Sequence, residues 1–322
     1  DMDCALLGLL TASLYSSSDG DLTALLYGVL LHSPGNGTGV YRIYRLDHMD
    51  ARMASLCVDA DRTTKYVSPG IPIGKGLVNP GQKMRSERKI GVLIPALNEE
   101  KAIARVIQDI PDWVDRVVVV DNGSSDDTSK VAAALNVDVT REPQRGYGAA
   151  CLTGIARLQD MDMIVFLDGD YSDYPEEMVM LVDPIIEGKS DLVIGSRTSG
   201  QSQSGSLTLQ QIAGNWLACR LMNLIWSTHY TDLGPFRAIR TSTLEKMEMK
   251  DRGYGWTIEM QIKSALHQIR VSEVPVSYRV RIGKSKISGT IKGTVLASLK
   301  IISVIMRFAL RSNAAAIRVQ DE

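Results

Sequence analysis

Short apolar runs alternate along the chain with segments in which apolar residues recur every three or four positions. The short runs predict strands, and the periodic segments predict helices. The predicted strands are Ile90–Leu97, Val117–Val120, Val137–Thr140, Met163–Leu167 and Asp191–Gly195, and the predicted helices are Glu99–Ile110, Asp126–Leu135, Gly148–Leu158, Glu176–Glu187 and Gln210–Trp226. Strands and helices alternating at these lengths indicate an α/β fold, with a mostly parallel sheet covered by helices on both faces.

The first 88 residues do not share this alternation. They contain Ser/Gly-rich pieces at 16–20 and 33–37, and two short helices are possible, over Leu22–Leu31 and Asp47–Val58. Such composition favours loops over a packed core. We therefore predict a weakly structured extension over residues 1–88, a folded domain over 89–311 and a tail over 312–322.

Composition excludes several classes of protein. The chain has 322 residues, of which 44% are hydrophobic and 23% charged, as in ordinary globular proteins. Its four cysteines are scattered, which predicts neither a disulfide framework nor a zinc site and favours a reducing, cytoplasmic location. No uncharged apolar run is long enough to span a bilayer, and no basic segment precedes the Leu-rich start as in a signal peptide.

Positive charge is concentrated near the C-terminal end. Residues 274–320 contain nine basic residues and no Asp or Glu, which indicates an anionic partner. A helix over Ile291–Arg311 would gather five polar residues on one side, opposite a broad apolar face; they are Lys292, Lys300, Ser303, Arg307 and Arg311. This pattern is typical of a helix at a membrane surface. The alternative is a helix packed on the sheet with a solvated basic edge. No nucleic-acid-binding motif is found.

Two carboxylates follow one of the wholly apolar strands directly. Asp168 and Asp170 come one residue apart after Met163–Leu167. Carboxylates in this arrangement can share one hard cation, and Mg²⁺ or Mn²⁺ held by few carboxylates takes its other oxygens from water and substrate phosphates. The motif predicts a metal-dependent site for a diphosphate substrate, and a solvated turn is the alternative.

Other strand ends also carry polar motifs, where ligands bind in open α/β sheets. Asn98 is a predicted helix N-cap, and Asp121 can accept hydrogen bonds from a base or ribose. Arg145 and Gly146 begin the helix that follows the third strand, where small residues let a phosphate approach. Tight packing explains the glycines equally well.

Tryptophan and tyrosine residues allow two further predictions. Trp216 and Trp226 are expected in the core. The stretch from Tyr254 to Trp256 is expected in a loop, where it could stack on a sugar or base.

Several motifs in this order and spacing resemble the family 2 glycosyltransferases of the GT-A fold. They are PALNEE, VVVVDNGSSDDT, RGYGAA, FLDGDYSD and LVIGSR. TDLGPFRAIR, GYGWTIEMQ and RIGKSKISGT further resemble the branch of dolichyl- and polyprenyl-phosphate sugar synthases. The resemblance covers residues 89–311 and implies a nucleotide-sugar donor, Mg²⁺ or Mn²⁺, inversion at the anomeric carbon and a polyprenyl-phosphate-type acceptor at the membrane surface.

The resemblance also implies residue roles. The nucleotide site would comprise Pro95, Ala96, Asn98, Glu99, Asp121, Gly123, Ser124, Arg145, Gly146 and Asp168. Asp168 and Asp170 would hold the metal. The acceptor phosphate would meet Arg197, Arg279, Arg281, Lys284 and Lys286. For a hydroxyl acceptor, Asp232 would be the first candidate for the general base and Glu259 the second. Arg197 would be a third catalytic residue. An ion pair of Asp232 with Arg237 is the structural alternative.

One departure and three other functions stay open. Ser172 stands where mannose synthases of this branch often offer a third group to the metal, which weakens a mannose-synthase assignment. The acceptor could be a soluble hydroxyl compound. A sugar-nucleotide nucleotidyltransferase or a non-catalytic binding protein could share the same alternating pattern.

Overall fold

The computed structural model describes residues 12–16, 22–26, 85, 87–283 and 300–310, and the chain divides into two units, Asp1–Gly74 and Lys75–Glu322. In the first unit, β1 (Ala12–Ser16) pairs antiparallel with β2 (Leu22–Leu26). The helix predicted over Leu22–Leu31 is therefore wrong at its start, because a short apolar run does not distinguish helix from strand. The helix predicted over Asp47–Val58 lies outside the described residues.

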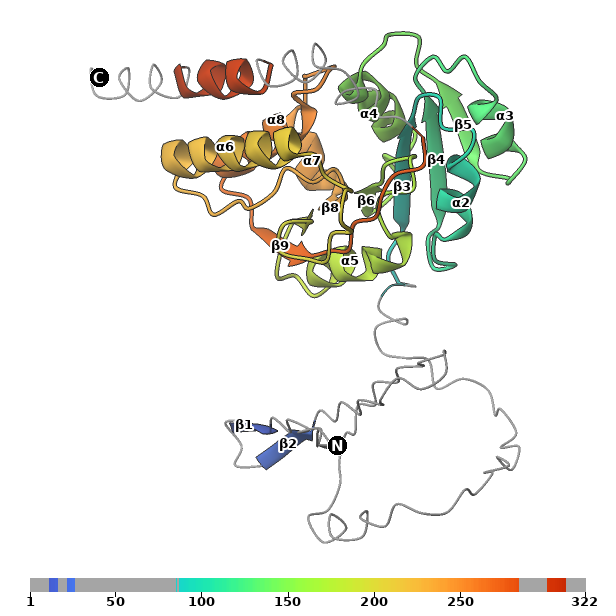
Figure 1. The fold of residues 1–322 in the computed structure, drawn as a ribbon. Helices are drawn as coiled ribbons and strands as arrows, with labels where there is room; N and C mark the ends of the chain where they lie inside the picture. The colour runs from blue at the N-terminus through green and yellow to red at the C-terminus, as the bar shows by residue number, and fades with distance from the viewer. Residues whose placement is uncertain (1–11, 17–21, 27–84, 86, 284–299, 311–322) are drawn as a thin grey trace, which may run out of the picture. The chain divides into compact units, whose positions relative to one another are not determined.

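The described part of the second unit contains a seven-stranded sheet in the order β5-β4-β3-β6-β8-β7-β9 (Figure 1). Its strands are β3 (Ile90–Ala96), β4 (Arg116–Asp121), β5 (Asp138–Arg141), β6 (Met163–Phe166), β7 (Leu192–Ser196), β8 (Arg237–Arg240) and β9 (Val271–Pro275). Only β8 runs antiparallel to its neighbours, β6 and β7. The carboxyl ends of the other strands therefore share one edge, which is where the polar motifs fall.

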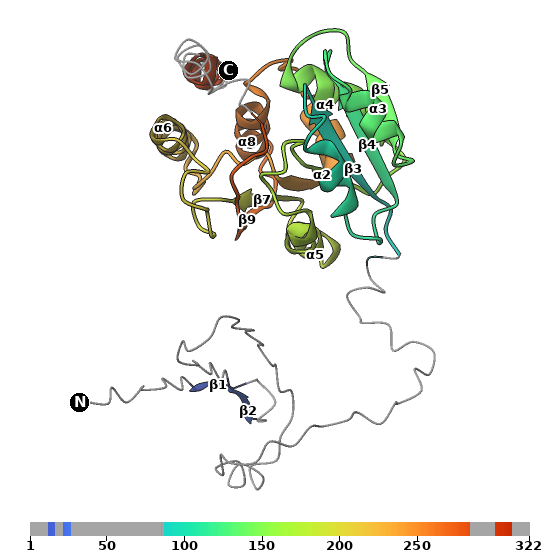
Figure 2. The same cartoon turned by 45° about the vertical axis from the view of Figure 1, so that its right-hand side comes forward.

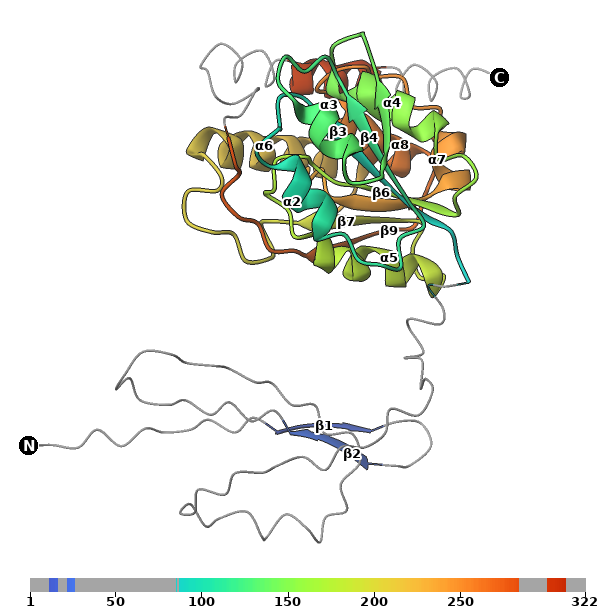
Figure 3. The same ribbon diagram turned by 90° about the vertical axis from the view of Figure 1, so that its right-hand side faces the viewer.

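Helices cover both faces of this sheet (Figures 2 and 3). They are α2 (Ile103–Gln108), α3 (Thr128–Ala133), α4 (Tyr147–Ala156), α5 (Met178–Ile186), α6 (Leu209–Trp226), α7 (Thr241–Met247), α8 (Trp256–Leu266) and a helix over 300–310, with a 3₁₀ turn, η1, at Pro175–Glu177. Alternate residues of each strand enter different cores: Val92 and Ile94 pack with α2, α3 and α5, while Leu93 packs with α4, α6, α7, α8 and helix 300–310.

The predicted α/β alternation is confirmed, with shifts at its ends. The α2 helix begins at Ile103, four residues after its predicted start, because residues 99–102 form a turn in which the Glu99 carbonyl accepts hydrogen bonds from the Ala102 and Ile103 amides. Asn98 is therefore not a helix N-cap. The sequence pattern did not predict β8, α7, α8 or β9, whose apolar residues are interrupted by buried polar ones such as Arg237 and Gln261.

The tryptophan predictions are partly wrong. Trp216 lies on α6 and is 61% exposed, although it was expected in the core. Trp256 begins α8, is 1% exposed and packs against Phe166 with ring centroids 6.2 Å apart. Trp256 is therefore a core residue that cannot stack on a ligand, whereas Tyr254 is exposed.

Helix 300–310 packs on the domain. Val304 and Ile305 are buried in the core shared with α8, whereas Ile302, Met306 and Leu310 are exposed. Lys300 forms an ion pair with Asp251 at 2.8 Å. Within the described ranges, no helix is long and apolar enough to cross a bilayer.

A matched pair of tryptophan variants tests this core. We expect Trp256→Ala to lower the free energy of unfolding by about 3–5 kcal/mol, because it empties a large buried site. Trp216→Ala should change it by less than about 0.5 kcal/mol, because Trp216 faces solvent. Urea unfolding followed by circular dichroism measures both, and equal losses would contradict the described packing.

Candidate active site

A cavity of about 660 Å³ opens at the carboxyl edge of the sheet. Residues after β3, β4, β6 and β7 contribute to its lining, together with α4, α6 and the segment after β9. The lining residues that the sequence predicted are Pro95, Ala96, Asn98, Glu99, Arg145, Gly146, Asp168, Asp170, Arg197 and Arg281. Ten of the predicted site residues are thus brought to one pocket.

Asn98 joins the ends of β3 and β4. Its φ of +55° turns the chain sharply, and asparagine tolerates this left-handed conformation better than most residues. Its side-chain oxygen accepts a hydrogen bond from the backbone amide of Ser125 at 2.8 Å. The backbone amide of Asn98 donates to Ser124 Oγ at 3.0 Å. Ser124 therefore supports the pocket wall without lining it.

Asp121 lies behind this wall. Its carboxylate accepts hydrogen bonds from the Ser124 amide at 2.8 Å and from the Ser129 hydroxyl at 2.7 Å. Burial acts to raise the pKa of Asp121, but these hydrogen bonds outweigh it and hold the pKa below its ordinary value. Asp121 is thus a fixed anion that connects the loop at Ser124 to Ser129 of α3, and the adjacent Asn122 lines the pocket.

Asn122 holds the loop that carries Arg145. Its side-chain amide donates to the Glu142 and Gln144 carbonyls, and its oxygen accepts from the Gly146 amide at 2.7 Å. Arg145 in turn donates to the Gly123 carbonyl at 2.9 Å. The cation of Arg145 is therefore positioned at the pocket by a network that begins at the end of β4.

Gly146 and Gly148 admit another backbone segment. A Cβ at Gly148 would lie 2.0 Å from the Asp251 carbonyl oxygen, and one at Gly146 would lie 2.0 Å from that of Arg252. The Gly148 amide donates to the Gly253 carbonyl. Close packing, rather than phosphate approach alone, thus explains why the start of α4 needs small residues. The tight packing considered as an alternative therefore applies to both glycines, and a phosphate next to Gly146 stays a prediction.

Asp168 and Asp170 lie in the pocket just after β6. Tyr147 donates its hydroxyl hydrogen to Asp168 at 3.3 Å. Burial raises the pKa of Asp168, although the cations of Arg281 and Arg197 oppose this shift. Asp170 accepts a hydrogen bond from the Ser172 amide and forms an ion pair with Arg281. Ser172 therefore contacts Asp170 itself, and a guanidinium already balances that carboxylate.

Asp173 adds a third carboxyl group next to this pair. It is 2% exposed, and neither of its side-chain oxygens has a hydrogen-bond partner among the described residues. Burial, followed by the charge of Asp168, raises the pKa of Asp173 to about 8. This surplus of acidic groups at a strand end fits a divalent cation, which would favour their ionised forms.

In the described chain, no group of three or more His, Cys, Asp or Glu side chains has the geometry of a complete metal site. Asp168 and Asp170 as ligands of Mg²⁺ or Mn²⁺ stay a prediction, which their carboxylates in the main pocket fit. Their remaining coordination positions suit water and phosphate oxygens.

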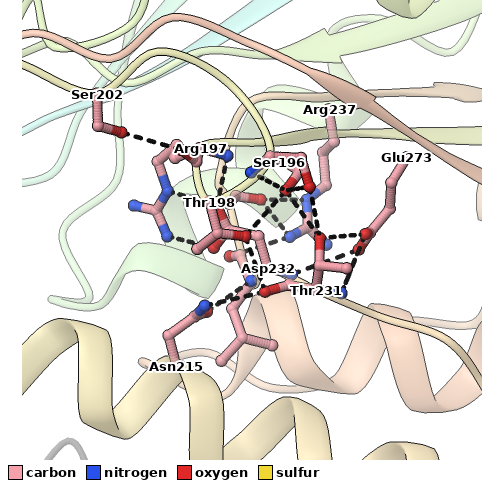
Figure 4. A network of polar contacts seen from close by, with 12 residues as sticks. Ser196, Arg197, Thr198, Ser202, Asn215, Thr231, Asp232, Arg237 and Glu273 are labelled. Carbon is pink, nitrogen blue, oxygen red and sulfur yellow. Dashed lines mark hydrogen bonds and ion pairs between the residues drawn. The ribbon is translucent and has the colours of Figure 1, made fainter.

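Arg197 and Asp232 form a buried pair (Figure 4). Arg197 donates to both carboxylate oxygens of Asp232, at 2.9 and 2.7 Å, and its backbone amide donates at 2.7 Å. Burial acts to lower the pKa of Arg197, but Asp232 raises it above its ordinary value. Asp232 is fully buried behind Arg197 and does not line the pocket.

Arg237, the alternative partner considered for Asp232, does not pair with it. Its guanidinium donates to the Leu233, Gly234 and Thr257 carbonyls. The structural ion pair considered as the alternative role of Asp232 is therefore formed with Arg197 and not with Arg237.

The structure places two predicted residues, Glu259 and Arg279, elsewhere. Glu259 lies outside the pocket, where its carboxylate accepts from the Lys250 and Asp251 amides and pairs with Lys263. Arg279 is held between the Tyr171 and Tyr174 rings and donates to the Tyr171 carbonyl. Lys284 and Lys286 lie outside the described residues.

Sequence reasoning missed part of the lining. The guanidinium carbon of Arg197 lies 5.1 Å from the centre of the Tyr278 ring. The Tyr147 hydroxyl donates a hydrogen bond to Asp168. The missed polar residues of α6 are Gln210, Gln211 and Asn215. Tyr147 stands inside the quoted motif RGYGAA, which could have indicated it. The α6 residues carry no such signal, because polar side chains on a surface helix usually indicate solvent exposure.

This sheet, with its carboxylates and arginines at the strand ends, defines a GT-A-type transferase of nucleotide-activated sugars. The model of glycosyl transferase family 2 matches residues 91–247. An uncharacterized glycosyltransferase of Mycobacterium bovis is 33% identical over 219 residues, which cover 67% of this chain and 97% of that protein. The chain belongs to glycosyl transferase family 2, and it is a glycosyltransferase. Neither a nucleotidyltransferase nor a non-catalytic protein fits this finding.

Two further relatives are informative. The dolichyl-phosphate hexose transferase of Haloferax volcanii is 30% identical over 229 residues, covering 69% of this chain and 96% of that protein. A glucosyl-3-phosphoglycerate synthase of Mycobacterium tuberculosis, solved with Mn²⁺, UDP and glucosyl-3-phosphoglycerate, is 25% identical with a TM-score of 0.57, covering 76% of this chain and 86% of that one. The same enzyme has been solved with Mg²⁺ and UDP.

The difference in unfolding free energy between Asp173→Asn and the wild type should depend on pH. The pKa of Asp173 is raised to about 8 in the folded chain, against about 3.9 when unfolded. Between these values the folded chain holds a proton that the unfolded chain releases, so this carboxyl costs more stability as pH rises. The gain in unfolding free energy of Asp173→Asn should therefore grow from about pH 5 to about pH 8.

Urea unfolding without divalent metal measures this gain. The control is Asp160→Asn, because Asp160 lies at the surface and pairs with Arg116. The hydrogen bond from Arg116 lowers the pKa of Asp160, so Asp160→Asn should show no such growth. A gain for Asp173→Asn that stays constant or shrinks with pH contradicts the assignment.

Proposed function

We propose that this chain is an inverting, metal-dependent glycosyltransferase that moves a sugar from a nucleoside-diphosphate donor to a polyprenyl-phosphate-type lipid at a membrane surface. The observation that carries the proposal is the composition of the main pocket. Carboxylates suited to a metal and arginines suited to phosphates share one cavity, and α6, which lines that cavity, has an apolar outer face.

The donor would occupy the side of the pocket formed after β3 and β4. Pro95, Ala96, Asn98 and Glu99 would contact the nucleoside, with Asp121, Gly123 and Ser124 supporting that wall. Arg145 and Gly146 would face the diphosphate, where a guanidinium fits phosphate oxygens well. The structural relative that binds UDP supports a nucleotide at this edge.

Asp168 and Asp170 would hold Mg²⁺ or Mn²⁺ next to the diphosphate. The bound metal supplies Lewis-acid stabilisation of the departing nucleoside diphosphate. Both ions occur in complexes of the structural relative. Arg281 pairs with Asp170, and the metal would take over that charge balance and leave the guanidinium available to an anionic acceptor.

The acceptor would be a phosphate rather than a hydroxyl group. Its oxygen would attack the anomeric carbon as the bond to the donor diphosphate breaks on the opposite face. A phosphate is already anionic and needs no general base. The two predicted bases support this, because Asp232 is fully buried against Arg197 and Glu259 lies outside the pocket. Arg197 and Arg281 would bind the acceptor phosphate.

The apolar face of α6 supports a lipid acceptor. Leu209, Ile212, Trp216, Leu217, Leu224 and Ile225 are all exposed on this helix, and Ile302, Met306 and Leu310 are exposed on helix 300–310. Both helices lie on the same side of the sheet (Figures 1 and 2). Exposed apolar groups gathered in this way mark surfaces that meet a membrane or partner. The relative that is a dolichyl-phosphate hexose transferase agrees with this assignment.

A soluble phosphorylated acceptor is the second candidate. The structural relative has been solved with glucosyl-3-phosphoglycerate, a small anionic product. The arginines of the main pocket suit that chemistry too. A lipid acceptor requires the exposed apolar residues of α6 to contact the membrane, whereas a soluble acceptor does not.

The metal role is tested with Asp168→Asn and Asp170→Asn. Each should reduce transfer from a nucleotide sugar by about a thousandfold, because the leaving diphosphate loses its metal. Radiolabelled donors, with Mn²⁺ or Mg²⁺ and a polyprenyl phosphate, measure the rate. The exposed Asp160→Asn variant is the control and should keep wild-type activity. Full metal-dependent transfer by Asp170→Asn would refute the assignment.

The lipid role is tested with Trp216→Ser together with Leu224→Ser. Removing two exposed apolar groups should weaken binding to vesicles of phosphatidylcholine and polyprenyl phosphate by about tenfold or more. Co-sedimentation measures binding, and Leu266→Ser on α8 is a control at another exposed apolar position. Unchanged vesicle binding, with transfer to a soluble phosphorylated acceptor, would favour the second candidate.

A further inference from the structure

A second cavity, of about 450 Å³, lies between α8 and helix 300–310. Five basic and two acidic residues line it, with an apolar floor; they are Lys250, Arg252, Lys263, Lys300, Arg307, Asp251, Glu259, Val304 and Phe308. None of them lines the main pocket. The basic groups outnumber the acidic ones by three.

Both carboxylates are already satisfied. Glu259 accepts hydrogen bonds from the Lys250 and Asp251 amides and pairs with Lys263 at 2.9 Å. Asp251 accepts from the Gly253 and Gly255 amides and pairs with Lys300 at 2.8 Å. The acidic residues therefore organise the cavity and leave little charge to balance further cations.

The remaining cations lie at the rim. Among the described residues, Arg307 forms no ion pair, and Lys250 reaches only the exposed Glu248 at 3.7 Å. Arg252 donates to the neutral side chain of Gln144. Three cations of one sign facing one cavity repel each other, and an anion between them would remove that repulsion.

We propose that this second cavity binds a phosphate-type anion, either free or as part of a lipid headgroup. Guanidinium and ammonium groups together form the strong charge-assisted hydrogen bonds that phosphate oxygens accept. The apolar floor formed by Val304 and Phe308 suits a carbon group attached to that phosphate. The proposal does not depend on the function assigned to the main pocket.

One wall separates the two cavities. Asp251 and Arg252 line the second cavity, whereas Tyr254 and Thr257 line the main pocket. The Arg252 carbonyl accepts a hydrogen bond from Ala149, at the start of α4, where Gly146 and Tyr147 reach the main pocket. The segment that lines the second cavity therefore packs against the start of α4, next to the main pocket.

The experiment combines Arg307→Gln with Lys250→Gln in the full chain. Both side chains are at the rim, so their loss leaves the buried pairs intact. Equilibrium dialysis with radiolabelled inorganic phosphate counts bound phosphate per chain. Flotation with phosphatidylcholine vesicles, with and without about a fifth of phosphatidylglycerol, measures headgroup binding. Lys246→Gln on α7 removes one positive charge, half of what the double variant removes, from an exposed position and is the control.

The proposal predicts loss of one of two signals. If the anion is free phosphate, the double variant binds one phosphate fewer per chain, or binds it about tenfold more weakly. If it is a headgroup, the double variant loses about tenfold in the preference for phosphatidylglycerol. Lys246→Gln should change neither. If the double variant matches wild type in both measurements, or Lys246→Gln loses as much, the proposal is overturned.

Discussion

Crowded negative charge at the end of β6 is the constraint on which the rest of the site depends. Asp168, Asp170 and Asp173 fall within six residues, and burial raises the pKa of both Asp168 and Asp173. Such a group is stable only if cations meet it. Arg281 does so from the segment after β9, and Arg197 from the end of β7. The same balance makes the pocket suitable for a divalent metal and phosphates.

A second constraint is the contact between the start of α4 and the segment 251–253. Gly146 and Gly148 let two backbones meet where any Cβ would collide. This contact fixes the loop that carries Arg145 on one side and the wall of the second cavity on the other. The main pocket and the second cavity therefore share this contact as a common structural element.

The apolar pattern predicted the α/β alternation, and the resemblance to family 2 glycosyltransferases implied the ten pocket residues. Most of them lie where the strand ends of a parallel sheet converge on one edge. The sequence did not predict that Asp232 pairs with Arg197, 35 residues away, since partner choice is decided by tertiary packing. Glu259 matched a family motif, yet its carboxylate holds Lys263 in another cavity. Trp216 was expected in the core but is exposed, and Trp256 was expected in a loop but is buried. Spacing alone does not tell which face of a helix other elements cover.

The central claim is that Asp168 and Asp170 hold a divalent metal against a nucleoside diphosphate. A crystal structure of the full chain grown with Mn²⁺ and UDP tests it directly, because manganese gives an anomalous signal. The account predicts a manganese peak within bonding distance of Asp170, Asp168 or both, with the diphosphate between the metal and Arg145. Bound UDP without manganese at these carboxylates, or manganese at another place in the chain, would contradict it.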